Sequence, residues 1–172
     1  PETTNTPTLT PEPVFALDIS YEDTENLLEE WTGTRFMLYK EEEGVRLYQG
    51  YSIDLALRVE IFEIDQQTVG LMVVFNENAN VNSMEQSRYV AKVMNYFVSI
   101  DSVEWLAQNV PEEVGEITAN GFMSKGGEVG VSMMKHEEGV YSIWALDINH
   151  LEGKDISVGE GSIGIDSSGI GS

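Results

Sequence analysis

Histidine is scarce and Cys is absent in this sequence, and no side chains stand at the spacings of a known catalytic motif. The chain has no Cys and two His, His136 and His150. Without Cys, thiolate catalysis, disulfides and zinc–thiolate sites are excluded. The two His lack the HExxH spacing that places two imidazoles on one metal, and no Gly-x-Ser-x-Gly elbow is present. The sequence therefore points to no particular reaction.

Oxygen-bearing side chains gather in two loops where a hard cation could bind. Asp147, Asn149, Glu152 and Asp155 follow the last strong strand pattern. Calcium takes several oxygen ligands from carboxylates, amides and carbonyls, which alternating loop positions can supply. The Asn-rich stretch at 76–82 offers mainly amide oxygens and favours turn and cap chemistry instead. The acidic loop is therefore the candidate metal site, and calcium is the only cofactor considered.

Three tyrosines form a candidate ligand-binding surface. Tyr39, Tyr48 and Tyr51 fall close together along adjacent expected strands. If their rings share a solvent-facing side, they can stack on sugars or pack against side chains of a partner. The alternative is that they cover the sheet edge or pack beneath the N-terminal segment.

Paired carboxylates give a third hypothesis, a hydrolase. Glu60 and Glu63 lie on or near one expected strand, and Glu137 and Glu138 share an expected turn. A glycosidase-like mechanism needs two carboxylates facing each other across a cleft. Acidic residues are so common in this chain that a pair in the sequence is not specific for such a cleft.

The charge balance narrows the classes of partner. The chain has 30 Asp and Glu against 9 Lys and Arg, a formal net charge of −21. Such a surface repels phosphate backbones and anionic lipid, which excludes nucleic acid and electrostatic membrane docking. It favours divalent cations or a basic partner, and it also keeps the chain soluble. No apolar run approaches the roughly 20 residues of a transmembrane helix, so no membrane-spanning segment is predicted.

Hydrophobic periodicity predicts the elements that position these residues. A short helix is expected over 23–31, ended by Gly33, followed by strands over 34–40, 45–51, 55–62 and 69–75. A long helix over 84–100, capped by Ser83 with Gln86, precedes a short helix that is capped by Asp101-Ser102 and runs through Gln108. Further strands are expected over 114–123, 129–133 and 140–148. The predicted fold class is α+β, a largely antiparallel sheet of hairpins with the helices on one face and water on the other.

Two of the expected hairpin turns have similar sequences. Residues 40–45 read KEEEGV and residues 135–140 read KHEEGV. Duplication of a half-domain would explain the similarity, and so would independent use of the same acidic turn.

The termini differ in composition from the central part. The first thirteen residues, PETTNTPTLTPEP, contain four Pro and five Thr, which predicts a disordered tether. A single domain is expected over 14–150. Residues 151–172 form a Gly/Ser-rich tail with one edge strand expected around 156–158.

The tether resembles the spacer that follows the lipid-attachment Cys or the signal cleavage site of bacterial lipoproteins and secreted proteins. That resemblance implies an extracytoplasmic protein, either secreted or lipid-anchored to the cell surface through a segment upstream of Pro1. The leading hypothesis is a non-enzymatic domain that binds a protein or small ligand at the cell envelope. The alternatives are a calcium-dependent or carbohydrate-binding module, and the hydrolase.

Overall fold

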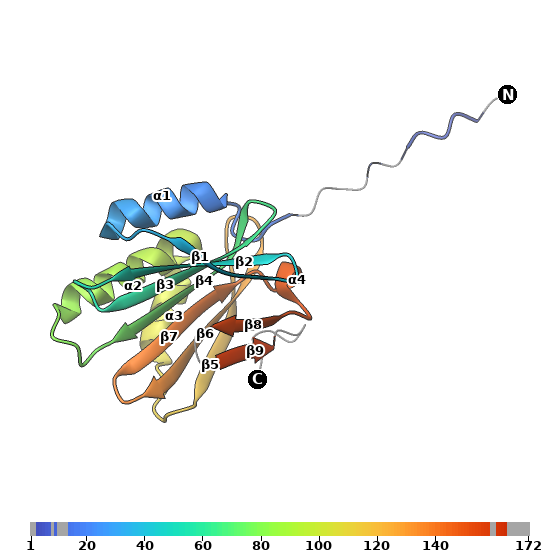
Figure 1. The fold of residues 1–172 in the computed structure, drawn as a ribbon. Helices are drawn as coiled ribbons and strands as arrows, with labels where there is room; N and C mark the ends of the chain where they lie inside the picture. Colours follow the sequence, from blue (N-terminus) through green and yellow to red (C-terminus); the bar gives the residue numbers. More distant parts are fainter. Residues whose placement is uncertain (1–2, 8, 10–13, 159–160, 165–172) are drawn as a thin grey trace.

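The computed structural model describes residues 3–7, 9, 14–158 and 161–164, with side chains described as far as residue 154. Four helices and nine strands lie in this part of the chain (Figure 1). Their bounds, in chain order, are α1 Tyr21–Thr32, β1 Met37–Glu42, β2 Val45–Ser52, β3 Leu57–Ile64, β4 Gln67–Asn76, α2 Ser83–Phe97, α3 Ile100–Gln108, β5 Ile117–Met123, β6 Glu128–Glu137, β7 Val140–Leu146, α4 Ile148–Leu151, β8 Asp155–Val158 and β9 Gly161–Gly164.

Seven strands form one antiparallel sheet in the order β1-β2-β3-β4-β7-β6-β5. Its middle is the pairing of β4 with β7, where Val73 lies opposite Ile143. Each half of the sheet is a meander of hairpins, as the short turns between the period-2 segments predict. The α+β prediction with a largely antiparallel sheet is confirmed.

The helices α1, α2 and α3 cover one face of the sheet (Figure 1). The core beneath them includes Leu28 from α1, Val93 and Phe97 from α2, and Leu106 from α3, packed on apolar side chains of the strands. Burial of this apolar area is the main favourable contribution to the folding of the domain. The helix-covered face was expected from the sequence.

The second face of the sheet is buried as well, which corrects the expectation of a water-facing side. Phe62, Met72 and Trp144 project from it and are at most 2% exposed. Leu151 of α4 and Phe15 pack onto this second cluster. The middle strands therefore carry apolar side chains on both faces of the sheet. Alternation in the sequence does not by itself predict that the second face is covered by other segments.

The helix caps differ from the predicted ones by one to three residues. Asn82 caps α2, because its side chain accepts the backbone N–H groups of Met84 and Glu85. The predicted capping partner Gln86 instead donates its amide N–H groups to the carbonyls of Leu55 and Asn76. Ser20 and Ser99 cap α1 and α3 in the same manner as Asn82. A Ser, Asn or Asp near the start of a helix thus predicts that the helix is capped. Where several such residues stand close together, it does not predict which of them is the cap.

The two similar turns have the same backbone conformation at their glycines. Gly44 and Gly139 both have φ of +79°, which L side chains rarely adopt. The residues before these glycines differ, because Glu43 also has a positive φ, of +53°, and Glu138 does not, so the two turns are alike in sequence but not in their whole backbone conformation.

The predicted N-terminal tether and C-terminal tail lie only partly within the described residues. Residues 3–7 and 9 lie in no helix or strand, and the rest of the predicted tether lies outside the described part. The expected strand at 156–158 is present as β8, but it pairs with β9 in a separate hairpin. None of the helices in the described part has the length and apolarity required for a membrane span.

Candidate functional site

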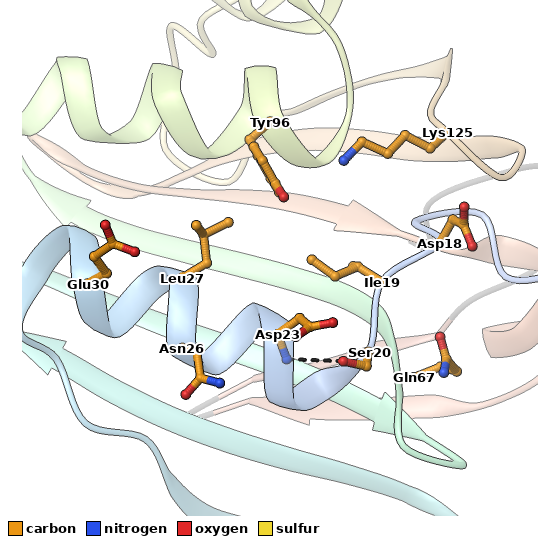
Figure 2. Close-up of a pocket in the computed structure, with 10 residues that line it drawn as sticks. All are labelled: Asp18, Ile19, Ser20, Asp23, Asn26, Leu27, Glu30, Gln67, Tyr96 and Lys125. Atoms are coloured by element: carbon orange, nitrogen blue, oxygen red, sulfur yellow. Dashed lines mark hydrogen bonds between the residues drawn. The ribbon is translucent and has the colours of Figure 1, made fainter.

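A cleft of about 620 Å³ lies between α1 and the turn that joins β5 to β6 (Figure 2). The residues lining it come from the segment before α1, from α1 itself, from the start of β4, from the C-terminal end of α2 and from the turn between β5 and β6. They are Asp18, Ile19, Ser20, Asp23, Asn26, Leu27, Glu30, Gln67, Tyr96 and Lys125. Polar groups make up most of this lining, so the cleft suits a polar or charged ligand.

One wall of the cleft is a single face of α1. Asp23, Asn26, Leu27 and Glu30 stand at i, i+3, i+4 and i+7, which places them on one side of a helix. The Ser20 hydroxyl accepts the backbone N–H of Asp23 at 3.0 Å and fixes the start of this helix. Two further contacts hold α1 on the sheet. The N–H of Tyr21 donates to the Gln66 carbonyl at 2.8 Å, and the Thr24 and Thr68 hydroxyls lie 2.7 Å apart.

The opposite wall carries Lys125 on the turn between β5 and β6. Its ammonium lies 4.3 Å from the centre of the Tyr96 ring, a cation–π contact on the side of the cleft opposite α1 (Figure 2). The turn is anchored by the Ser124 hydroxyl, which donates to the Phe97 carbonyl at 2.6 Å. It is also anchored by the N–H of Gly126, which donates to the Ala16 carbonyl at 2.9 Å.

Gly126 is required at this turn by close approach. A Cβ at this position would lie 2.0 Å from the backbone oxygen of Phe15. Any larger residue must push apart the turn and the segment that leads into α1. The turn at Gly126 therefore also helps to form the cleft.

The charge in the cleft is predominantly negative. Asp18, Asp23 and Glu30 face it together with Lys125. Within the part of the chain that the structure describes, none of the three carboxylates forms an ion pair with a Lys or Arg. Nor do the described residues contain a group of three or more His, Asp or Glu side chains placed to hold a metal ion. The cleft thus offers separate carboxylates that can each accept hydrogen bonds from a cationic ligand.

The candidate tyrosines do not form one surface. Tyr48 packs on the helix-covered face, where its ring stacks on Tyr21 of α1 with centres 4.0 Å apart. Tyr39 and Tyr51 are exposed, and the Tyr51 hydroxyl donates to Gln49 Oε1 at 3.4 Å. Residues 48 and 51 are three apart in a strand, so they point to opposite faces. A ligand-binding role for the two exposed rings stays a prediction.

The candidate calcium loop is organised around Asp147, which is fully buried. Its Oδ2 accepts the N–H of Ala16 at 2.8 Å and lies 2.8 Å from Nδ1 of His150, while Oδ1 accepts the N–H of His150 at 3.3 Å. Asn149 and Glu152 are exposed, and the side chain of Asp155 lies outside the described residues. The proposed four-residue set is therefore not placed as a whole, and calcium binding at this loop stays a prediction.

The paired carboxylates considered for a hydrolase do not share a cleft. Glu60 projects from the second face, where it accepts a hydrogen bond from the Gln49 amide at 2.5 Å. Glu63 lies beyond a β-bulge and contacts Arg46 Nη1 at 3.7 Å on the helix-covered side. Glu137 and Glu138 are exposed at the end of a hairpin. No facing pair of the kind that hydrolysis needs is formed by these four residues.

A polar cluster on the second face was not indicated by the sequence; its His136 is exposed, whereas its Ser142 and Trp144 are buried. His136 Nε2 lies 2.7 Å from the Ser142 hydroxyl oxygen, which also accepts the indole N–H of Trp144 at 3.0 Å. Partial burial, with the nearby Arg58 charge, lowers the pKa of His136. A neutral imidazole beside a hydroxyl is the arrangement of a base and a nucleophile. Ser142 has no exposed surface, so a substrate cannot reach it in this conformation.

The acidic cleft also escaped the sequence analysis. Asp23 was expected only at the start of a helix, and no role was predicted for Lys125. The spacing of Asp23, Asn26 and Glu30 was visible, but any solvent-facing helix side has the same pattern. The pairing of α1 with a turn a hundred residues away depends on tertiary structure.

No family model, curated protein or solved structure matches this chain. Its function is therefore inferred from its own residues.

Proposed function

We propose that this chain is a non-enzymatic binding domain whose ligand or partner presents a cationic group to the cleft beside α1. The observation that carries the proposal is the cleft lining, where Asp18, Asp23 and Glu30 face a single cation, Lys125. The net charge of −21 adds a long-range attraction for basic partners. A lysine or arginine side chain of a peptide has the matching charge and hydrogen-bond donors.

The geometry of the cleft supports a positioned contact in addition to general attraction. Asp23 and Glu30 are two helical turns apart on α1, so one extended basic segment can contact both. The Tyr96 ring holds the Lys125 ammonium at the same cleft, which shows that a cationic side chain is accommodated there. A basic peptide is therefore a better match than an isolated monovalent ion.

The Pro/Thr-rich composition of the first thirteen residues supports a location outside the cytoplasm, secreted or anchored at the cell surface. In that setting the domain would be held away from its attachment point and its cleft would meet partners of the cell envelope. The proposed location and the proposed ligand class rest on separate observations.

The test is a titration with tetralysine, monitored by chemical-shift changes, with the fully acetylated peptide as the uncharged control. Asp23→Asn combined with Glu30→Gln is expected to weaken binding by roughly ten-fold, since exposed charge pairs contribute about 1 kcal/mol each at most. The matched control is Glu85→Gln combined with Glu104→Gln, which removes the same charge from exposed positions on α2 and α3.

If both double variants weaken the binding of tetralysine equally, its affinity depends only on the net charge of the protein, which would contradict a specific site. Binding of the acetylated peptide with the same affinity would contradict the cationic ligand class. Shift changes confined to Asp23, Glu30, Tyr96 and Lys125 in the wild type would support the cleft.

A further inference from the structure

The two edges of the seven-stranded sheet differ in how well they are protected. The edge strand β1 carries the charged residues Lys40, Glu41 and Glu42, and a bulge interrupts its pairing between Leu38 and Lys40. Charges and bulges are the usual features that prevent an exposed edge from pairing with another strand. The other edge strand, β5, has neither feature.

The edge strand β5 is regular and uncharged along its whole length. Its seven residues, ITANGFM, pair with β6 without a register shift. Ile117 is 40% exposed and Met123 is 68% exposed. In a chain in which 23% of residues are charged, an uncharged edge strand with exposed apolar side chains is well suited to add a further strand.

In the described part of the chain, β5 pairs with β6 on one side and with no strand on the other. The N–H of Gly121 donates to the side chain of its neighbour Asn120 at 2.9 Å, which shows that this N–H is turned away from β6. In an antiparallel ladder the N–H and C=O groups of alternate residues point the same way, so those of Ala119 and Met123 share this edge. Among the described residues, no backbone group from another segment pairs with them.

We propose that β5 pairs antiparallel with β5 of a second copy of this chain, about a two-fold axis at Asn120. The two seven-stranded sheets then continue into one another, each copy using the same surface. A closed two-fold pairing leaves only the protected β1 edges at the ends of the combined sheet.

In this register the side chains of β5 in one copy are complementary to those of β5 in the other copy. Ile117 lies opposite Met123 of the second copy, and the axis repeats that apolar contact. On the helix-covered side Thr118 lies opposite Phe122 of the second copy. Cross-strand pairs of this kind are the unit of sheet stabilisation, and the two-fold axis supplies each of them twice.

The charges at the two ends of β5 select an antiparallel partner with the same sequence. Glu116 precedes the strand, and its carboxylate accepts the N–H groups of Glu112 and Glu113 at 2.8 and 3.1 Å. These hydrogen bonds lower the pKa of Glu116 and keep it negatively charged. Lys125 follows the strand at its other end. Antiparallel pairing therefore brings the acidic end of one copy beside the basic end of the other.

Sedimentation velocity at physiological ionic strength tests this pairing, because at low salt two chains of −21 repel each other. The mass of the wild type is expected to rise from 19.1 kDa towards twice that value as its concentration increases through the micromolar range. Over the same range, hydrogen exchange at the Gly121 and Met123 amides is expected to slow.

Two variants at the axis make the test specific. Asn120→Lys and Asn120→Glu each place like charges opposite each other, and each alone is expected to weaken association more than ten-fold. A one-to-one mixture of the two is expected to restore association, because it places opposite charges at the axis. Asn80→Lys and Asn80→Glu, which change an exposed residue in the loop before α2, are the matched controls and should associate as the wild type does.

Melting curves of the two Asn120 variants, whose altered side chain is exposed, establish that they fold. A wild type that stays at 19.1 kDa throughout would overturn the proposal. So would association of either Asn120 variant alone with the strength of the wild type, or failure of the folded mixture to associate.

Discussion

Glu60 shows at the scale of a single residue how the second face of the sheet is held together. Its side chain has no exposed surface, one oxygen accepts the Gln49 amide, and Arg58 Nε lies 3.3 Å from the same oxygen. The other oxygen, Oε2, has no hydrogen-bond partner among the described residues. Burial raises the pKa of Glu60 to about 7, although Arg58 and Gln49 oppose the rise. The folded protein therefore holds a proton on Glu60 more tightly than the unfolded chain does.

Replacing Glu60 with Gln should stabilise the protein in a pH-dependent way. Below pH 4.5, the ordinary pKa of the group, Glu60 is protonated in both states and the variant should differ little from the wild type. Between pH 4.5 and about 7 the unfolded chain loses this proton before the folded one does, so the wild type loses stability as pH rises. The advantage of Glu60→Gln should grow across this window to at most about 3 kcal/mol, measured by urea unfolding.

The exposed Glu104 provides the control for this experiment, because Glu104→Gln makes the same change in net charge at the surface. Its effect on the free energy of unfolding should stay nearly constant across the same pH range. A difference between Glu60→Gln and wild type that does not vary with pH would contradict the raised pKa.

The caps of the helices allow a prediction at the scale of an element. Asn82 Oδ1 accepts the N–H groups of Met84 at 3.1 Å and of Glu85 at 3.2 Å. Asn82→Ala is expected to lower the free energy of unfolding by about 1 kcal/mol, the usual contribution of a cap. Chemical denaturation with circular dichroism measures the change.

Ser83→Ala distinguishes the observed cap from the one expected from the sequence. Ser83 is the first residue of α2 rather than its cap, and Ala is favourable inside a helix. We expect this variant to be nearly neutral. A larger loss for Ser83→Ala than for Asn82→Ala would show that the helix begins one residue later.

Most elements of the fold could be predicted from the sequence, because alternation and helical spacing are local signals. β3 and β4 alternate clearly, and α2 has a wide apolar stripe, so their positions were correct within about three residues. The sheet order was not predictable, since the pairing of β4 with β7 joins residues about seventy positions apart. The burial of the second face was not predictable for the same reason, because Leu151 and Phe15 reach that face only through tertiary contacts.

The candidate site was harder to predict than the fold. Tyr48 and Tyr51 are three residues apart in one strand, so they point to opposite faces of the sheet, and this could have been predicted from the sequence. By contrast, a bulge between Lys135 and Glu137 allows His136 to approach Ser142, and the cleft depends on Lys125 lying opposite α1. Neither arrangement leaves a signal in local sequence.

At the scale of the whole molecule, the net charge predicts how the melting temperature depends on salt. With 30 acidic against 9 basic side chains, mutual repulsion opposes the compact state, and salt screens it. Raising NaCl from about 20 mM to about 300 mM at pH 7 should raise the melting temperature, as measured by differential scanning calorimetry. Near pH 4, where many carboxylates are protonated, the same addition should have a smaller effect. A melting temperature at pH 7 that does not respond to NaCl would contradict this explanation.

The contacts of Ala16 determine how the domain would respond to mechanical force. Its N–H is held by Asp147 and its carbonyl by Gly126, while the neighbouring Phe15 ring stacks on His150 with centres 4.1 Å apart. A pull on the chain before Val14 therefore reaches the ends of β7 and the turn between β5 and β6 before it reaches α1. The wall of the cleft that α1 forms is shielded from such a load, whereas the turn that carries Lys125 receives it, so tension on the N-terminal segment acts on one wall of the cleft only.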